Sequence, residues 1–210
     1  MKTIIKVSLI VMMVTATLQA ERVNRYAVKS GKVAYDITGS KEIKAIGLKE
    51  SIKGEKSVVF DAYGDKEIVE SQISTESKSQ GQSSVEKEHE LIYTNGADQY
   101  QVNFDRKRIT KRKNPYYVAN YTLVDGKDIN AYLPKAKQSG TETVAGLECT
   151  VWKTKKESLC IYKGIILKKY SDGVTVAATK AEFDVVPGQD DFKLPDLPLY
   201  DKRGKKIVSE

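Results

Sequence analysis

The chain has 210 residues and a formal net charge of +7, with 30% charged residues, which suits one folded domain whose surface carries charges of both signs. It contains one histidine and two cysteines, so a multi-histidine metal centre is excluded. Twelve tyrosines against four phenylalanines and one tryptophan favour strands over helices.

The first 20 residues have the order of a secretory signal peptide. Lys2 and Lys6 supply the positive start, residues 7–14 are mostly apolar, and small and polar residues lead to a cut after Ala20. The alternatives are a transmembrane anchor or a buried helix, but a spanning helix needs about 20 apolar residues. No cysteine lies near position 20, so we expect no acyl anchor. We therefore expect a periplasmic or secreted protein that does not span the membrane.

Short alternating segments separated by glycine turns dominate the rest of the chain. The expected strands are residues 32–37, 57–63, 67–74, 90–93, 100–104, 147–153, 159–162, 165–167 and 174–176. Asn95-Gly96 and Asp172-Gly173 are typical of hairpin turns, because both turn positions favour positive φ. Successive hairpins indicate an antiparallel meander. We predict a mainly β fold: a large curved antiparallel sheet, or open half-barrel, with one or two covering helices.

Three segments depart from this rhythm. Residues 115–137 have weaker, helix-like spacing and should hold most of the helix. Residues 72–88 are polar and fit either a flexible loop or the solvent-facing ends of two long strands. We expect one domain over residues 21–200, followed by a basic flexible tail at residues 201–210.

Five apolar side chains at alternating positions of the expected strands are candidates for the ligand-binding or core face. They are Tyr35, Phe60, Phe104, Val151 and Leu167. The pattern leaves open which of them touch a ligand and which fill the core.

A basic run is the sharpest charge feature of the chain. It comprises Arg106, Lys107, Arg108, Lys111, Arg112 and Lys113. It fits an anionic partner in the envelope, such as lipid headgroups, lipopolysaccharide or an acidic protein face. It also fits a solvated strand edge that lysine and arginine keep from pairing. The expected compartment argues against nucleic acid as a partner.

No pattern in the chain indicates catalysis. The sole histidine, His89, lies in a charged stretch and reads as a surface residue, with a proton switch as the alternative. Nucleophile-elbow, phosphate-loop and dinucleotide motifs are absent from the sequence. Acidic pairs such as Asp190-Asp191 are too common here to indicate a two-carboxylate hydrolase. We expect no enzyme, no metal and no cofactor.

Cys149 and Cys160 are expected to form a disulfide, because export places them in an oxidising compartment. Two buried free thiols or a redox pair are the alternatives, although a redox pair normally has the closer Cys-x-x-Cys spacing. A hairpin centred between Thr154 and Lys155 sets the two cysteines directly opposite each other. The polar loop at residues 153–156 would put them at a non-hydrogen-bonded site, where a cross-strand bond is easier.

Several short motifs resemble an uncharacterised family of bacterial envelope proteins. They are residues 28–35 (VKSGKVAY), 60–64 (FDAYG), 143–152 (TVAGLECTVW), 160–168 (CIYKGIILK) and 192–195 (FKLP). That family is similar to the LolA/LolB-like lipoprotein carriers. The resemblance implies an open half-barrel with helices over its mouth, which holds acyl chains in its concave face in the periplasm. This chain has no carrier motif that matches residue by residue, and it lacks the acylated N-terminus of the LolB-like branch.

These observations favour an exported binding or carrier protein with an apolar cleft for an acyl chain or another hydrophobic ligand. A lipid or lipoprotein acyl chain is the expected partner. The alternative is an envelope scaffold or interaction module with a filled core and no ligand.

The signal peptide makes a direct prediction. N-terminal sequencing of the exported protein should begin near Glu21. An intact Met1 on envelope-localised protein would instead indicate an uncleaved anchor.

Overall fold

The computed structural model describes residues 23–208, which form one twelve-stranded sheet. The expected signal peptide and its cut lie outside the described residues. The strands are β1 Gly31–Ile43, β2 Leu48–Asp61, β3 Lys66–Ser79, β4 Gln82–Asn95, β5 Asp98–Asn103, β6 Arg108–Lys113, β7 Lys137–Val144, β8 Leu147–Lys153, β9 Glu157–Tyr162, β10 Ile165–Ser171, β11 Val174–Phe183 and β12 Leu199–Tyr200. The helices are α1 Pro115–Ala119 and α2 Ile129–Tyr132, with 3-10 turns η1 Lys44–Ile46, η2 Ala62–Gly64, η3 Val124–Gly126 and η4 Gln189–Phe192.

The sheet is open and its strand order is β12-β6-β5-β4-β3-β2-β1-β11-β10-β9-β8-β7. Neighbouring strands pair antiparallel, apart from β12, which pairs parallel with β6. The mainly β, curved antiparallel prediction is therefore confirmed. The polar segment at residues 72–88 is the end of two long strands, β3 and β4, which turn at Gln80 and Gly81, both at positive φ.

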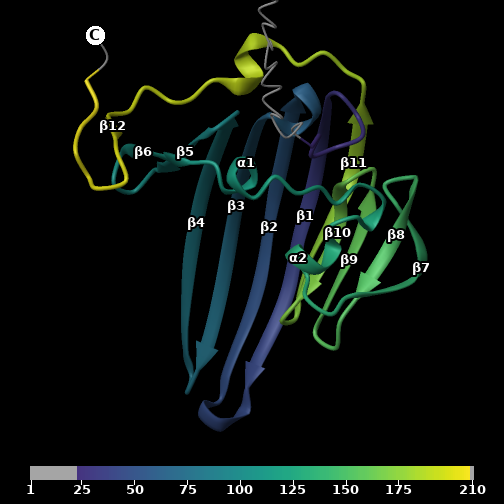
Figure 1. The fold of residues 1–210 in the computed structure, drawn as a ribbon. Coiled ribbons are helices and arrows are strands. Elements are labelled where there is room, and N and C mark those ends of the chain that lie inside the picture. The colour runs from purple at the N-terminus through teal and green to yellow at the C-terminus, as the bar shows by residue number, and fades with distance from the viewer. Residues whose placement is uncertain (1–22, 209–210) are drawn as a thin grey trace, which may run out of the picture.

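Both α-helices lie in the expected region, and the strand order explains why they cover the sheet. The chain leaves β6 near one edge and enters β7 at the other edge, so residues 114–136 must cross one face (Figure 1). Asn114 caps α1 by accepting from the Tyr116 N–H, Pro115 starts it, and Asn120 ends it in a left-handed conformation. We call residues 115–133 the roof.

On the opposite face, the C-terminal segment (residues 184–200) packs against one end of the sheet, where it runs from β11 to pair with β6 (Figure 1). Its anchor Phe192 packs against residues of β3 to β6 that point away from the roof, including Ile68, Leu91 and Ile109. Asp191 also pairs with Lys32 of β1, with a closest distance of 2.7 Å. Residues 201–208, where we expected a flexible tail, form a turn in which the Ile207 N–H donates to the Leu199 carbonyl.

β1 to β4 extend well beyond the roof (Figure 1), and there neither face is buried. Within residues 38–53, which hold the far ends of β1 and β2, each residue is exposed or half-buried. The same strands are therefore a packed core at one end and a solvated ribbon at the other.

Cys149 and Cys160 form the expected disulfide, with an S–S distance of 2.13 Å. The predicted register is wrong, because Val151, and not Cys149, lies opposite Cys160. The Thr154 hydroxyl accepts from the N–H groups of Lys156 and Glu157, which centres the turn one residue later than expected. That shift moves each cross-strand partner by two positions, so both sulfurs still lie on the same face of the sheet.

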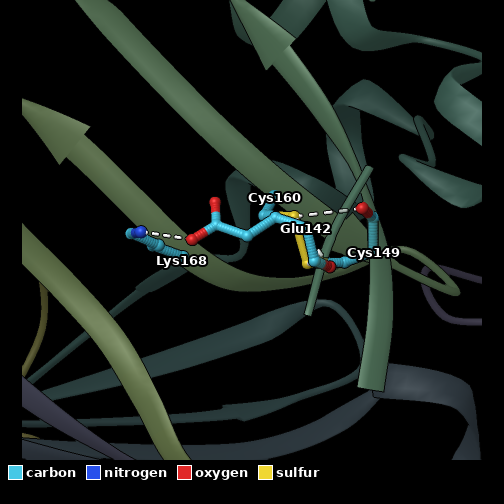
Figure 2. Close-up of a disulfide and its surroundings, with 4 residues drawn as sticks. All are labelled: Glu142, Cys149, Cys160 and Lys168. Atoms are coloured by element: carbon cyan, nitrogen blue, oxygen red, sulfur yellow. Dashed lines mark hydrogen bonds and ion pairs between the residues drawn. A yellow bond between two sulfur atoms is a disulfide. The ribbon is translucent and has the colours of Figure 1, made fainter. Parts of the chain in front are cut away.

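The disulfide sits where the sheet curls so strongly that β7 and β10 approach each other. Glu142 of β7 pairs directly with Lys168 of β10, although β8 and β9 lie between these strands in the sheet (Figure 2). Cys149 and Cys160 are 1% and 2% exposed beneath this ion pair. The bond therefore holds the inner surface of the curl.

We predict that replacing both cysteines by serine preserves the fold and lowers the melting temperature modestly. Closing so short a loop contributes about 2–3 kcal/mol on the chain-entropy estimate. Thermal unfolding followed by circular dichroism measures the change. Loss of the β signal at room temperature in the double variant would show that the disulfide carries much more of the fold than this.

Candidate functional site

A cavity of about 370 Å³ lies between the roof and the sheet face formed by β1 to β4. Roof residues Tyr116, Tyr121, Leu123 and Tyr132 line one side of it. Hollows of about 940 and 780 Å³, at the β8–β9 turn and beside Gly54, are larger but lie more open at the surface. The cavity under the roof is less open than these two hollows and is therefore the candidate site.

Strand register arranges the floor of this cavity in three rows that run across β2, β3 and β4. The inner row, nearest the N-terminal segment (residues 23–30), is Phe60, Glu67 and Thr94. The middle row is Val58, Val69 and Ile92. The outer row is Lys56, Ser71 and Glu90. The floor is therefore an apolar band between two rows that contain charges. Such a surface suits an amphipathic ligand better than a purely apolar one.

Glu67 ties the N-terminal segment to the sheet. This residue is 5% exposed, and its carboxylate pairs with Arg25 at 2.9 Å and accepts a hydrogen bond from the Tyr26 hydroxyl. Burial opposes the charge of Arg25, but the Glu67 carboxylate and the neighbouring tyrosines outweigh it and raise the Arg25 pKa. Burial raises the pKa of the Tyr26 hydroxyl, so this hydroxyl stays a proton donor to Glu67.

The same network holds the roof in place. The Arg25 guanidinium lies 4.0 Å from the centre of the Tyr116 ring in α1. The Thr122 hydroxyl donates to the Arg25 carbonyl, and the Val23 N–H donates to the Asn120 side chain. The far end of the roof packs through Ile129 and Leu133 onto Leu159 and Ile161 of β9. The roof is therefore fixed at both ends.

Two of the five predicted ligand-binding residues line the cavity. They are Tyr35, whose hydroxyl donates to the Ile166 carbonyl, and Phe60, which is fully buried. Val151 and Leu167 are buried in the core around the disulfide, outside the cavity lining. Phe104 lies outside this lining too and stacks on His89 at 3.8 Å between ring centres.

Sequence reasoning missed the charged residues of the cavity, namely Arg25, Lys56, Glu67 and Glu90. The sequence does contain a signal for three of them. Lys56 is in phase with Val58 and Phe60, Glu67 with Val69, and Glu90 with Ile92. A charge that keeps the alternation of an apolar face points toward the same side as the apolar residues.

The basic run does not form one surface. In β6, Arg112 donates to Gln99, which lines the cavity, whereas Lys111 and Lys113 both approach Asp98. Arg108 and Arg112 alternate with Lys111 and Lys113, so the two pairs point to opposite faces, and Arg106 and Lys107 lie in the preceding turn. His89 lies at the surface, as expected, and hydrogen-bonds to Glu70 at 2.7 Å on the face opposite the cavity.

Neither a protein-family model nor a curated protein matches this chain. Similar solved structures include an uncharacterized conserved protein from Thermus thermophilus, with a TM-score of 0.48 and 9% identity over 86% of this chain and 95% of that chain. MucB has a TM-score of 0.36 and 12% identity over 83% of this chain and 59% of that chain. These likenesses concern the fold alone and carry no argument about function. Across residues 23–208, no helix has the length and apolar character that crossing a membrane would need.

We predict that Glu67→Gln lowers the free energy of unfolding by about 2–3 kcal/mol, because it leaves the mostly buried Arg25 without its counter-charge. Glu70→Gln is the matched control, since Glu70 lies on the same strand, faces the other side and is 42% exposed. The control should change stability by about 0.5 kcal/mol or less. Urea unfolding measures both, and equal stabilities would refute the role given to Glu67.

Proposed function

We propose that this protein is an exported, non-catalytic binding or carrier protein that holds the acyl chain of an amphipathic ligand beneath its roof. The observation that carries the proposal is the apolar row of Val58, Val69 and Ile92, enclosed by the roof tyrosines. A volume of about 370 Å³ falls within the range of small-molecule sites. The short motifs that resemble an envelope family similar to the LolA/LolB-like carriers agree with this function.

The cavity lining continues outward along the sheet, which supports an elongated ligand. Ile37 of β1 and Ile73 of β3 lie on either side of Gly54 of β2 and line the same cavity. Gly54 has no side chain, so the sheet surface is low between the two isoleucines. This low surface lies beyond the row of Lys56 and Ser71, so the cavity has room at its outer end for an elongated ligand.

Two features support a place outside the cytoplasm. The first is the signal-peptide pattern of the sequence. The second is the Cys149–Cys160 disulfide, because such bonds persist in oxidising compartments and are rare in the cytosol. A carrier in the periplasm would shield acyl chains from water between membranes.

A second function, an envelope scaffold without a ligand, is favoured by the exposed ends of β1 to β4. Residues 82–89 of β4 are exposed, and β5 pairs with β4 only from Glu90 onward. Such an edge can accept a strand from a partner. Its alternating charges, with Glu86, Lys87 and Glu88 in succession, oppose unselective pairing.

Ligand binding is tested by filling the cavity. Ser71 lies in its floor and Gln72, the next residue of β3, is exposed, so Ser71→Phe and Gln72→Phe add the same ring on opposite faces. We expect lipid in organic extracts of the unmodified protein and of Gln72→Phe, and little in extracts of Ser71→Phe. Mass spectrometry of the extracts measures this. Extracts that are empty for all three proteins would favour the scaffold.

A further inference from the structure

The four charged side chains of the cavity differ in whether they have a hydrogen-bond or ion-pair partner. Arg25 pairs with Glu67, and Glu67 also accepts from Tyr26. Glu90 accepts a hydrogen bond from Gln101 of β5, on the side of β4 away from Lys56. Lys56 alone among these four has no hydrogen bond or ion pair within the part of the chain that the structure describes; its ammonium lies 5.4 Å from the centre of the Tyr35 ring.

An unpaired ammonium in a half-enclosed site has an energetic cost, because burial removes water without supplying a counter-charge. Burial lowers the pKa of Lys56, and the nearby Glu67 carboxylate offsets this only in part. Other lysines of this structure, such as Lys111, Lys168 and Lys32, do have carboxylate partners. An anion brought by the ligand would supply what Lys56 lacks.

The position of Lys56 within the floor fits a head-group site. It lies in the outer polar row, next to the apolar row of Val58, Val69 and Ile92. Its neighbour in the outer row is Ser71, whose short side chain leaves space beside the ammonium and can donate a hydrogen bond. A ligand with its charged end at Lys56 would place its chain over the apolar row and beneath the roof.

We propose that the ligand is an anionic amphiphile, with a carboxylate or phosphate head held by Lys56 and an acyl chain on the apolar row. This inference rests on the proposed binding function. It goes further by assigning the charge of the head group and the residue that selects it.

The test compares three ligands of one chain length, two with an anionic head group and one with a neutral head group. The mature protein is titrated calorimetrically with a saturated fatty acid, the corresponding neutral alcohol and the corresponding alkyl phosphate. We expect the acid or the phosphate to bind about tenfold more tightly than the alcohol, as one charge-assisted hydrogen bond would give. Tighter binding of the phosphate identifies a phospholipid-like head, and tighter binding of the carboxylate a free fatty acid.

Substitutions of Lys56 test whether this residue causes the preference for an anionic head group. Lys56→Met should weaken binding of the preferred anion about tenfold and leave the alcohol unchanged, and Lys56→Arg should keep most of the preference. Lys53→Met is the matched control, because Lys53 is an exposed lysine of the same strand that points to the other face. The control should change none of the affinities.

The outcomes separate this inference from the function on which it rests. Equal binding of acid, phosphate and alcohol by the unmodified protein overturns the anion site and leaves the carrier in place. A loss of alcohol binding in Lys56→Met as large as the loss of anion binding also overturns it, since Lys56 would then be structural. No binding of any of the three ligands overturns the proposed function itself. The preference of the unmodified protein needs no variant, so poor folding of Lys56→Met would not leave the question open.

Discussion

The cavity beneath the roof depends on one buried carboxylate, that of Glu67 in β3. It holds Arg25 by an ion pair and Tyr26 by a hydrogen bond, and Arg25 in turn stacks on Tyr116 of the roof. A buried ion pair rarely adds much net stability, but separating its two charges is costly, because each would remain buried without a counter-charge. The two side chains are therefore held in one arrangement. Glu67 therefore fixes where the roof sits above the sheet, and with it the height of the cavity.

The long strands serve different purposes along their length. At the roof end, alternate residues of β3 and β4 point into the cavity, whereas Ile68 and Leu91 between them pack beneath the C-terminal segment. At the far end the same strands have solvent on both sides (Figure 1). At this end of the sheet, the face beneath the roof can hold a ligand, while the face beneath the C-terminal segment forms a packed core that stabilises the fold.

Much of this architecture follows from short-range rules, and the parts that do not have identifiable physical causes. The hairpin at Asp172-Gly173 was predictable because tight turns need positive φ, which both residues adopt. The hairpin expected at Asn95-Gly96 forms one residue later, at Gly96 and Ala97, because Asn95 is the last residue of β4 and pairs with Asp98. The register at the disulfide was missed because the Thr154 hydroxyl recentres the turn, a side-chain effect that strand alternation does not contain. Val151 lies outside the cavity because it packs in the core around the disulfide. Phe104 lies outside it because it falls in the turn after β5 and packs with the cluster around Phe192. Alternation along a strand cannot say which of its two faces lines the site. The charged lining was missed because Lys56 and Glu90 resemble ordinary surface residues until the register places them beside Val58 and Ile92.

The central claim, that an acyl chain lies on the apolar row beneath the roof, is tested most directly by contacts between ligand and methyl groups. Neighbouring residues provide the comparison, because Val69 and Ile92 line the cavity while Ile68 and Leu91 point to the opposite face. Nuclear Overhauser contacts between a saturated fatty acid and methyl-labelled protein should appear at Val69 and Ile92 and be absent at Ile68 and Leu91. Contacts confined to Ile68 and Leu91, or none at all under saturating ligand, would contradict the account.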